Sequence, residues 1–222
     1  MKQKIPLISI VVLNWNGLLF LKETIPPLLD IDYPNYEVIV VDNGSTDKSV
    51  KFLKKFKKIK IIKNKENLGY SKGKNIGIGL AKGEYILSLD NDILIKDKYL
   101  LGKLLKMYKS RKGVGFLQIP LLDKNKTKTH YYGVYYSVYG LNMHRKEVDI
   151  KKITENKDSL VKIVGPTGGF FFIKKDAWED IGGFDESQGF HIDDVDIGPR
   201  SMIFDYENFL YTKSYAIHLE IN

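Results

Sequence analysis

Runs of apolar residues alternate with amphipathic stretches along the first half of the chain. Leu7–Leu13 is a continuous apolar run, which is typical of a parallel strand buried on both faces. The same patterning predicts further strands at 36–41, 59–62, 84–89 and 114–118, and helices at 16–29, 47–56, 71–81 and 98–109. Strands and helices in this order predict an α/β fold with a mixed, mostly parallel central sheet and helices on both faces.

Two local signals refine the first two helices. Pro26 and Pro27 lie near the end of the first one, and proline lacks the N–H that a helix interior needs, so we expect a break there. Ser45 or Thr46 precedes the second one, and hydroxyl side chains favour the N-cap position.

The pattern changes after residue 120. Residues 130–140 are aromatic and alternating, which predicts a hairpin or a long loop, and the polar residues 149–158 are expected to be exposed. A strand is predicted at 168–173, helices at 174–180 and 194–204, and short strands near 210 and at 215–218. There is no internal repeat and no low-complexity linker. We therefore expect one domain over residues 1–222, in which residues 121–222 fold over residues 1–120.

Polar residues collect where the predicted strands end. They form four segments, at 14–17, 42–47, 67–73 and 90–92. The carboxyl ends of parallel strands share one edge of a sheet, and ligands of open α/β sheets bind there. Turns use the same residue types, so it is the agreement of four segments that predicts a single binding crevice. Neither a G-x-G-x-x-G fingerprint nor a P-loop accompanies the first strand.

Two acidic clusters carry candidate chemistry. Asp90 and Asp92 are one residue apart, and carboxylates this close repel unless a cation such as Mg²⁺ or Mn²⁺ joins them; the alternative is an Asx-rich turn. Asp193, Asp194 and Asp196 lie within four residues, and a crowded carboxylate suits a general base, whereas helix capping is the alternative. A lone histidine near the end, His218, is either structural or a metal ligand.

Composition excludes several classes of protein. The chain has 222 residues, of which 43% are hydrophobic and 28% charged, so a sizeable core is expected and disorder is not. The absence of cysteine excludes disulfides, thiolate metal sites and cysteine nucleophiles. No apolar run approaches the ~20 residues that span a bilayer, and the first ten residues do not resemble a signal peptide. We expect a cytoplasmic protein.

Much of the net charge of +8 lies in a lysine-rich stretch, residues 51–65. A solvated helix face followed by a strand is the favoured interpretation. A peripheral contact with anionic lipid at the inner face of the membrane is the alternative. No motif or aromatic stacking pattern accompanies these lysines, so nucleic acid is not an expected partner.

Taken in order, the motifs resemble a known family. These are ISIVVLNWNG (8–17), VIVVDNGSTD (38–47), NLGY (67–70), DND (90–92), GGFF (168–171) and DDVDI (193–197). The chain resembles the family-2 glycosyltransferases of GT-A fold, particularly rhamnosyltransferase-like members, over residues 8–218. The resemblance implies metal-assisted, inverting transfer from a nucleoside-diphosphate sugar to a hydroxyl of a glycan or polyprenyl-linked acceptor.

The resemblance also implies roles for individual residues. Asp194 would be the catalytic base, with Asp193 and Asp196 orienting it or the acceptor. Asp92 and His218 would bind Mg²⁺ or Mn²⁺. The expected donor-binding set lies in or beside the polar segments and the GGFF motif, with Arg200 near phosphate: Leu13, Asn14, Asn16, Asp42, Asn67, Gly69, Lys74, Asp90, Asn91, Gly169 and Arg200. The resemblance divides the chain into a nucleotide-sugar half (1–120) and an acceptor and base half (121–222).

The sequence departs from the family pattern at two points, and two alternative functions stay open. The base motif is Asp-Asp where many relatives have Glu-Asp, and the sequence given stops four residues after His218, where many relatives continue. A non-catalytic sugar-nucleotide-binding subunit on the same fold is one alternative, although intact Asp92 and Asp194 argue against it. A nucleotidyltransferase is the other, but the Gly-rich basic loop expected after its first strand is absent. No residue identifies the sugar or the nucleotide.

Overall fold

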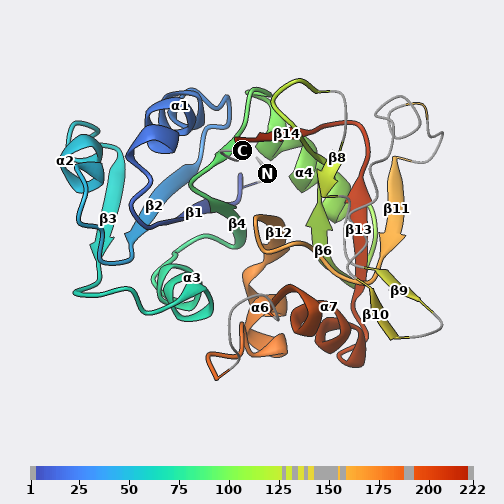
Figure 1. Cartoon of the computed structure of the whole chain (residues 1–222). Coiled ribbons are helices and arrows are strands. Elements are labelled where there is room, and N and C mark those ends of the chain that lie inside the picture. Colours follow the sequence, from blue (N-terminus) through green and yellow to red (C-terminus); the bar gives the residue numbers. More distant parts are fainter. Residues whose placement is uncertain are drawn as a thin grey trace.

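An eight-stranded mixed sheet forms the centre of the structure (Figure 1). The computed structural model describes residues 4–126, 129–131, 135–137, 140–142, 155, 159–187 and 193–219. The strand order is β11-β13-β6-β12-β4-β1-β2-β3. These strands are β1 (Ile8–Asn14), β2 (Tyr36–Asp42), β3 (Ile59–Lys63), β4 (Tyr85–Asp90), β6 (Val114–Gln118), β11 (Leu160–Ile163), β12 (Phe170–Lys174) and β13 (Glu207–Tyr211).

The first four strands are parallel, as predicted. β1 pairs with β2 and β4, and β2 pairs with β3, all in parallel register. Asn14 is opposite Asp42, and Leu13 is opposite Asp90, so the polar segments that follow β1, β2 and β4 meet at one edge. β12 is antiparallel to both of its neighbours, β4 and β6, and therefore joins the N-terminal strands to the remainder of the sheet.

Helices cover both faces of this sheet, which confirms the predicted fold class. Buried side chains of α1 (Leu18–Leu29), α2 (Ser49–Leu53) and α4 (Leu100–Lys109) pack on one face. Those of α3 (Tyr70–Gly79), α6 (Lys175–Ile181) and α7 (Asp193–Ile203) pack on the other (Figure 1). Alternate residues of one strand serve the two layers: Ile10 and Val12 belong to the first core and Val11 to the second.

A smaller sheet places the end of the chain beside the polar edge. It has the order β5-β14-β7-β8, made of β5 (Ile93–Leu94), β14 (Ala216–His218), β7 (Leu121–Leu122) and β8 (Thr129–Tyr131). The aromatic segment also contains an antiparallel pair, β9 (Tyr135–Ser137) and β10 (Gly140–Asn142), in agreement with the hairpin prediction. Most of the predicted polar stretch at 149–158 lies outside the described residues; Glu155 is exposed.

The predicted helix break and helix cap are wrong. α1 continues through Pro26 and Pro27 to Leu29. The prolines cannot donate to the carbonyls of Lys22 and Glu23, but both lie in the last turn, so the helix ends before another turn has to be built on the lost bonds. α2 begins at Ser49 and is shorter than predicted, and neither Ser45 nor Thr46 caps it. Instead the Ser49 N–H donates to Asp47 Oδ1 (2.8 Å). The Ser45 hydroxyl accepts a hydrogen bond from Asn14.

Candidate active site

Hydrogen bonds join the ends of three parallel strands. Asn14, at the end of β1, is fully buried, and its Nδ2 donates to Asp42 Oδ1 (3.0 Å) and Ser45 Oγ (3.2 Å). Its Oδ1 accepts from Asn91 Nδ2 (2.8 Å). Asp42 is also buried, and its Oδ2 accepts from the Ser45 N–H (3.2 Å). Asn14 therefore holds the loops after β2 and β4 in a defined position relative to β1.

Two further asparagines organise the outer loops. Asn16 has φ 50°, a left-handed conformation that asparagine tolerates, and its Oδ1 accepts the Thr46 N–H (2.8 Å). Asn67 Oδ1 accepts the Gly69 N–H (2.9 Å) and Asn43 Nδ2 (2.7 Å). Gly69 has φ 84° and accepts Asn43 Nδ2 through its carbonyl (2.9 Å). The predicted donor loops are thus fastened mainly by amide side chains.

Leu13 lies on the same edge, half-buried against α3. A Cβ atom placed on Gly73 would lie 2.6 Å from Leu13 Cδ1, so this helix approaches β1 closely where it has no side chain. That close approach brings Lys74, the next residue of α3, under the carboxyl end of β4.

Lys74 and Asp90 form an ion pair at this edge. The Lys74 side chain is fully buried, and its Nζ lies 2.9 Å from Asp90 Oδ1 and donates to the Leu89 carbonyl (2.6 Å). Burial lowers the pKa of Lys74, and the negative charges of Asp90, Asp92 and Asp194 oppose that shift. Burial raises the pKa of Asp90, while Lys74 partly offsets the effect. The ammonium therefore lies near both acidic clusters.

Asp92 and His218 meet because β5 and β14 pair. His218 is opposite Ile93, and the Leu219 N–H donates to the Asp92 carbonyl (2.9 Å). His218 Nε2 is 3.2 Å from Asp92 Oδ2. Asp92 Oδ1 is buried and has no hydrogen-bond partner within the described part of the chain. A buried carboxylate oxygen without a partner fits a cation ligand, and so does imidazole.

The two glycines of the GGFF motif lie between the acidic clusters. A Cβ atom on Gly169 would lie 3.5 Å from Asp90 Oδ2, and one on Gly168 would lie 2.9 Å from Asp194 Oδ1. The Asp90 N–H donates to the Gly169 carbonyl (3.0 Å). Asp194 is half-buried, near the start of α7. The structure therefore brings Asp90 and Asp194 beside adjacent glycines of one short turn.

The other predicted members of the α7 cluster are placed differently. Asp193 begins α7, and its side chain lies outside the described part of the chain. Asp196 forms an ion pair with Arg200, whose Nη1 also donates to the carbonyls of Gly183 (2.7 Å) and Ile181 (3.1 Å). Arg200 thus stabilises the turn after α6 in this structure, and its contact with phosphate stays a prediction.

Sequence analysis missed several residues that the geometry brings to the site. Tyr70 donates its hydroxyl hydrogen to the Gly168 carbonyl (2.5 Å). Gln118 and Thr167 pair through two buried hydrogen bonds (3.1 and 2.8 Å), which hold the chain just before Gly168. Tyr70 is part of the quoted NLGY motif, but its partner is 98 residues away in sequence, and no local pattern encodes such a contact.

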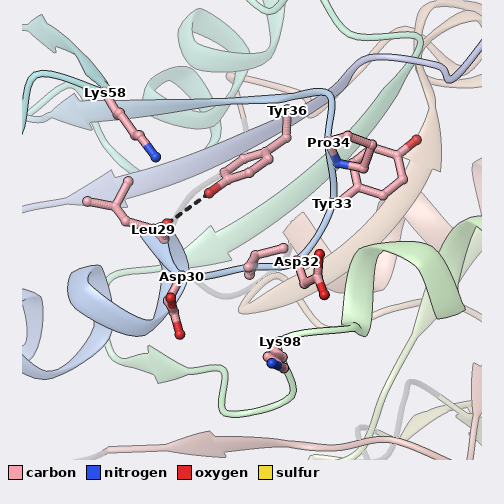
Figure 2. Close-up of a pocket in the computed structure, with 9 residues that line it drawn as sticks. Leu29, Asp30, Asp32, Tyr33, Pro34, Tyr36, Lys58 and Lys98 are labelled. Carbon is pink, nitrogen blue, oxygen red and sulfur yellow. Dashed lines mark hydrogen bonds between the residues drawn. The ribbon is translucent and has the colours of Figure 1, made fainter.

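A cavity of about 450 Å³ lies away from these residues, at the amino end of β2. Its lining includes Tyr36, Lys58 and Lys98, and the Tyr36 hydroxyl donates to the Leu29 carbonyl (3.0 Å) (Figure 2). Tyr36 begins β2 and Asp42 ends it. At the usual rise per residue of a β-strand, the length of β2 separates the cavity from the polar edge by ~20 Å. The cavity is therefore distinct from the candidate site.

The lysine-rich stretch forms an exposed surface over α2 and the edge strand β3. All eight lysines of this stretch are exposed: Lys51, Lys54, Lys55, Lys57, Lys58, Lys60, Lys63 and Lys65. Among the described residues, no helix is both long enough and apolar enough to cross a membrane.

The mixed, mostly parallel sheet with helices on both faces is the GT-A fold of solved glycosyltransferase structures. The model of the family described as glycosyl transferase family 2 matches residues 9–182. The chain belongs to glycosyl transferase family 2.

Relatives and solved structures agree with this membership. An uncharacterized glycosyltransferase of Haemophilus influenzae is 36% identical over 99 residues, which are 43% of this chain and 31% of that protein. Poly-beta-1,6-N-acetyl-D-glucosamine synthase of Staphylococcus epidermidis is 26% identical over 209 residues, 92% of this chain and 48% of the relative. The chain therefore spans less than half the length of these curated relatives.

Two solved structures are similar in fold. S. aureus TarS 1-349 in complex with UDP-GlcNAc has a TM-score of 0.69 at 21% identity, covering 97% of this chain and 59% of that chain. Mannosyltransferase PcManGT from Pyrobaculum calidifontis, in complex with GDP-Man and Mn²⁺, has a TM-score of 0.70 at 18% identity, covering 97% and 57%. The rhamnosyltransferase-like subgroup stays a prediction.

Proposed function

We propose that this chain transfers a sugar from a nucleoside-diphosphate sugar to a hydroxyl of a glycan or polyprenyl-linked acceptor, with inversion at the anomeric carbon. The observation that carries the proposal is the Gly168–Gly169 turn between Asp90 and Asp194. A displacement with inversion needs the leaving group and the base on opposite sides of the reacting carbon. The acceptor hydroxyl loses a proton as it attacks, and a carboxylate can accept it.

In this proposal Asp194 takes the acceptor proton, and the opposite side of the turn holds the departing diphosphate. The donor nucleotide lies along the edge formed by Leu13, Asn14, Asp42 and Asn91. Lys74 supplies positive charge beneath that edge through its ion pair with Asp90. Residues 1–120 then bind the donor, and residues 121–222 supply the base and the acceptor surface.

Asp92 and His218 would hold a divalent cation, Mg²⁺ or Mn²⁺. Among the described residues, no group of three or more His, Cys, Asp or Glu side chains is arranged to hold a metal. Two protein ligands are nevertheless compatible with Mg²⁺, which commonly takes its remaining ligands from water and substrate phosphates. The buried Asp92 Oδ1 supports this assignment. A bound cation would stabilise negative charge on the diphosphate.

A donor screen tests the activity. The chain is incubated with UDP-GlcNAc, UDP-glucose, GDP-mannose and dTDP-rhamnose, each with Mg²⁺, Mn²⁺ or EDTA. UDP-GlcNAc comes first because TarS was solved with it and the S. epidermidis relative is named for GlcNAc. We expect one donor to raise Tm, to release nucleoside diphosphate when acceptor is added, and to give product of inverted configuration by NMR. If no donor raises Tm or releases diphosphate, the proposal is wrong.

We include peripheral contact with anionic lipid in the proposal, on the cytoplasmic side of the membrane. Eight exposed lysines within residues 51–65 support it, since each lysine that comes near an anionic bilayer contributes about 1 kcal/mol. Co-sedimentation with vesicles of phosphatidylglycerol and phosphatidylcholine tests this. We expect binding that falls steeply with salt; equal recovery with purely phosphatidylcholine vesicles would contradict it.

A further inference from the structure

We propose that Tyr70 is a positioning residue for the base Asp194, and that it acts through Gly168. This inference rests on the proposed function, because it assigns a task to a side chain beside the proposed base. Tyr70 begins α3, on the donor side of the site, and its hydroxyl donates to the Gly168 carbonyl across the crevice (2.5 Å).

Gly168 is the point where the phenol and the carboxylate meet. A Cβ atom on Gly168 would lie 2.5 Å from the Tyr70 hydroxyl oxygen and 2.9 Å from Asp194 Oδ1. Real Cβ atoms do not approach other atoms that closely, so both groups occupy space that any larger residue would fill. The absence of a side chain lets Tyr70 and Asp194 lie against the same side of the turn.

The Tyr70 ring is itself held firmly. Its centroid is 5.6 Å from that of Phe184, in an edge-to-face arrangement, and the Lys74 Nζ lies 5.3 Å from it. Both contacts involve the ring and not the hydroxyl. The hydroxyl can therefore be removed by Tyr70→Phe while the ring and its packing remain, which separates positioning from folding.

The position of Asp194 depends on this turn, because the backbone of α7 packs against the same segment. A Cβ atom on Gly165 would lie 2.7 Å from Gly198 Cα and 3.7 Å from the Asp194 carbonyl oxygen. The start of α7 thus packs directly on the chain segment that Tyr70 holds at Gly168. Loss of the Tyr70 hydrogen bond would let the segment and the carboxylate shift together, away from the geometry that attack requires.

Steady-state kinetics of Tyr70→Phe tests the inference, with Tyr36→Phe as the matched control. Tyr36 also donates to a carbonyl, that of Leu29, at the opposite end of β2. Using the donor identified by the screen, we expect kcat to fall about tenfold in Tyr70→Phe, with donor KM, affinity for that donor's nucleoside diphosphate by calorimetry and Tm near wild type. We expect Tyr36→Phe to keep its kcat. Equal kcat in Tyr70→Phe and wild type would overturn the inference, and so would parallel losses of nucleoside-diphosphate affinity and Tm.

A double-mutant cycle adds a second readout. Gly168→Ala places a methyl group against the Tyr70 hydroxyl (2.5 Å), the Tyr70 ring carbon Cζ (2.9 Å) and Asp194 Oδ1 (2.9 Å), and Tyr70→Phe removes the closest of these three contacts. We expect Gly168→Ala to lower kcat less in the Tyr70→Phe background than in wild type. Strictly additive effects would mean no coupling and would contradict the inference. An inactive wild-type chain would instead count against the proposed function, and the two failures are therefore distinguishable.

Discussion

The edge proposed to bind the donor and the region proposed to hold the base are built by partly different means. The donor edge, at the ends of β1, β2 and β4, is held by side-chain hydrogen bonds such as those of Asn14. The base region, formed by residues 165–169 and α7, also has side-chain hydrogen bonds, those of Gln118 and Tyr70, but it depends in addition on close contacts between glycine backbones, above all Gly165 with Gly198. The first region depends on which polar groups are present, and the second depends also on where side chains are absent. Substitutions should therefore affect the two regions in different ways.

The largest expected effect comes from Asp194→Asn in the base region. The amide keeps the shape of the side chain but cannot accept the acceptor proton, so kcat should fall about 10³-fold, within the usual range for a general base. Calorimetry with the nucleoside diphosphate of the donor identified by the screen should show unchanged affinity. Asp205→Asn is the control: Asp205 is exposed with φ 60°, a conformation that suits asparagine. Normal turnover in Asp194→Asn would end the base assignment.

A smaller effect is expected from Asp92→Asn on the donor edge. The amide is a poor ligand for a hard cation, so affinity for the nucleoside diphosphate of the donor identified by the screen should fall by at least about tenfold in Mn²⁺, and affinity in EDTA should not change. Calorimetry of both proteins under both conditions measures this. If Mn²⁺ leaves the affinity of wild type and variant unaltered, Asp92 has no metal role.

Gly198→Ala tests the close backbone contact of the base region. Its Cβ atom would lie 2.5 Å from Gly165 Cα, so α7 must move. We expect a stability loss of about 1–3 kcal/mol, with lower kcat and unchanged affinity for the nucleoside diphosphate. Gly102→Ala in α4 is the matched control, since its Cβ meets nothing within 4 Å. It should stabilise by about 1 kcal/mol. Urea unfolding measures both; similar stabilities would contradict the packing argument.

The smallest effect concerns the seam where β4 meets β12. Tyr85 stacks on Phe172 with ring centroids 5.6 Å apart; burial, and then the charge of Glu84, raise the pKa of Tyr85 to about 12. Unfolded tyrosine ionises near pH 10, so this stability is complete below that pH and is lost as pH rises through the folded-state pKa. Between pH 10 and 12, Tyr85→Phe should lose about 1 kcal/mol less unfolding free energy than wild type. If the unfolding free energies of wild type and Tyr85→Phe change in parallel between pH 10 and 12, the prediction is wrong.

The sequence predicts the donor edge better than the base region. Strand periodicity and the position of polar residues after each strand suffice to bring Asn14, Asp42 and Asp90 together, because register in a parallel sheet follows from the strands. The contact of Asp92 with His218 depends on β5 and β14, and β5 has two residues, too few for a periodic signal. The Tyr70 hydroxyl meets the Gly168 carbonyl across 98 residues of sequence, and no local pattern encodes such a contact. The crowding of Asp193, Asp194 and Asp196 in the sequence suggested a general base and the family resemblance singled out Asp194, but neither predicted the contacts that surround it.

The position of β12 has a consequence for how the protein reaches this structure. β12 separates β4 from β6, although both of those strands precede it by many residues. The central sheet therefore cannot close until residues 170–174 leave the ribosome, and β4 waits with an unpaired apolar edge. Contacts between distant parts of a chain form slowly, and exposed strand edges promote aggregation during that interval. A growing chain that ends before β12 therefore exposes the edge of β4 to association with other chains.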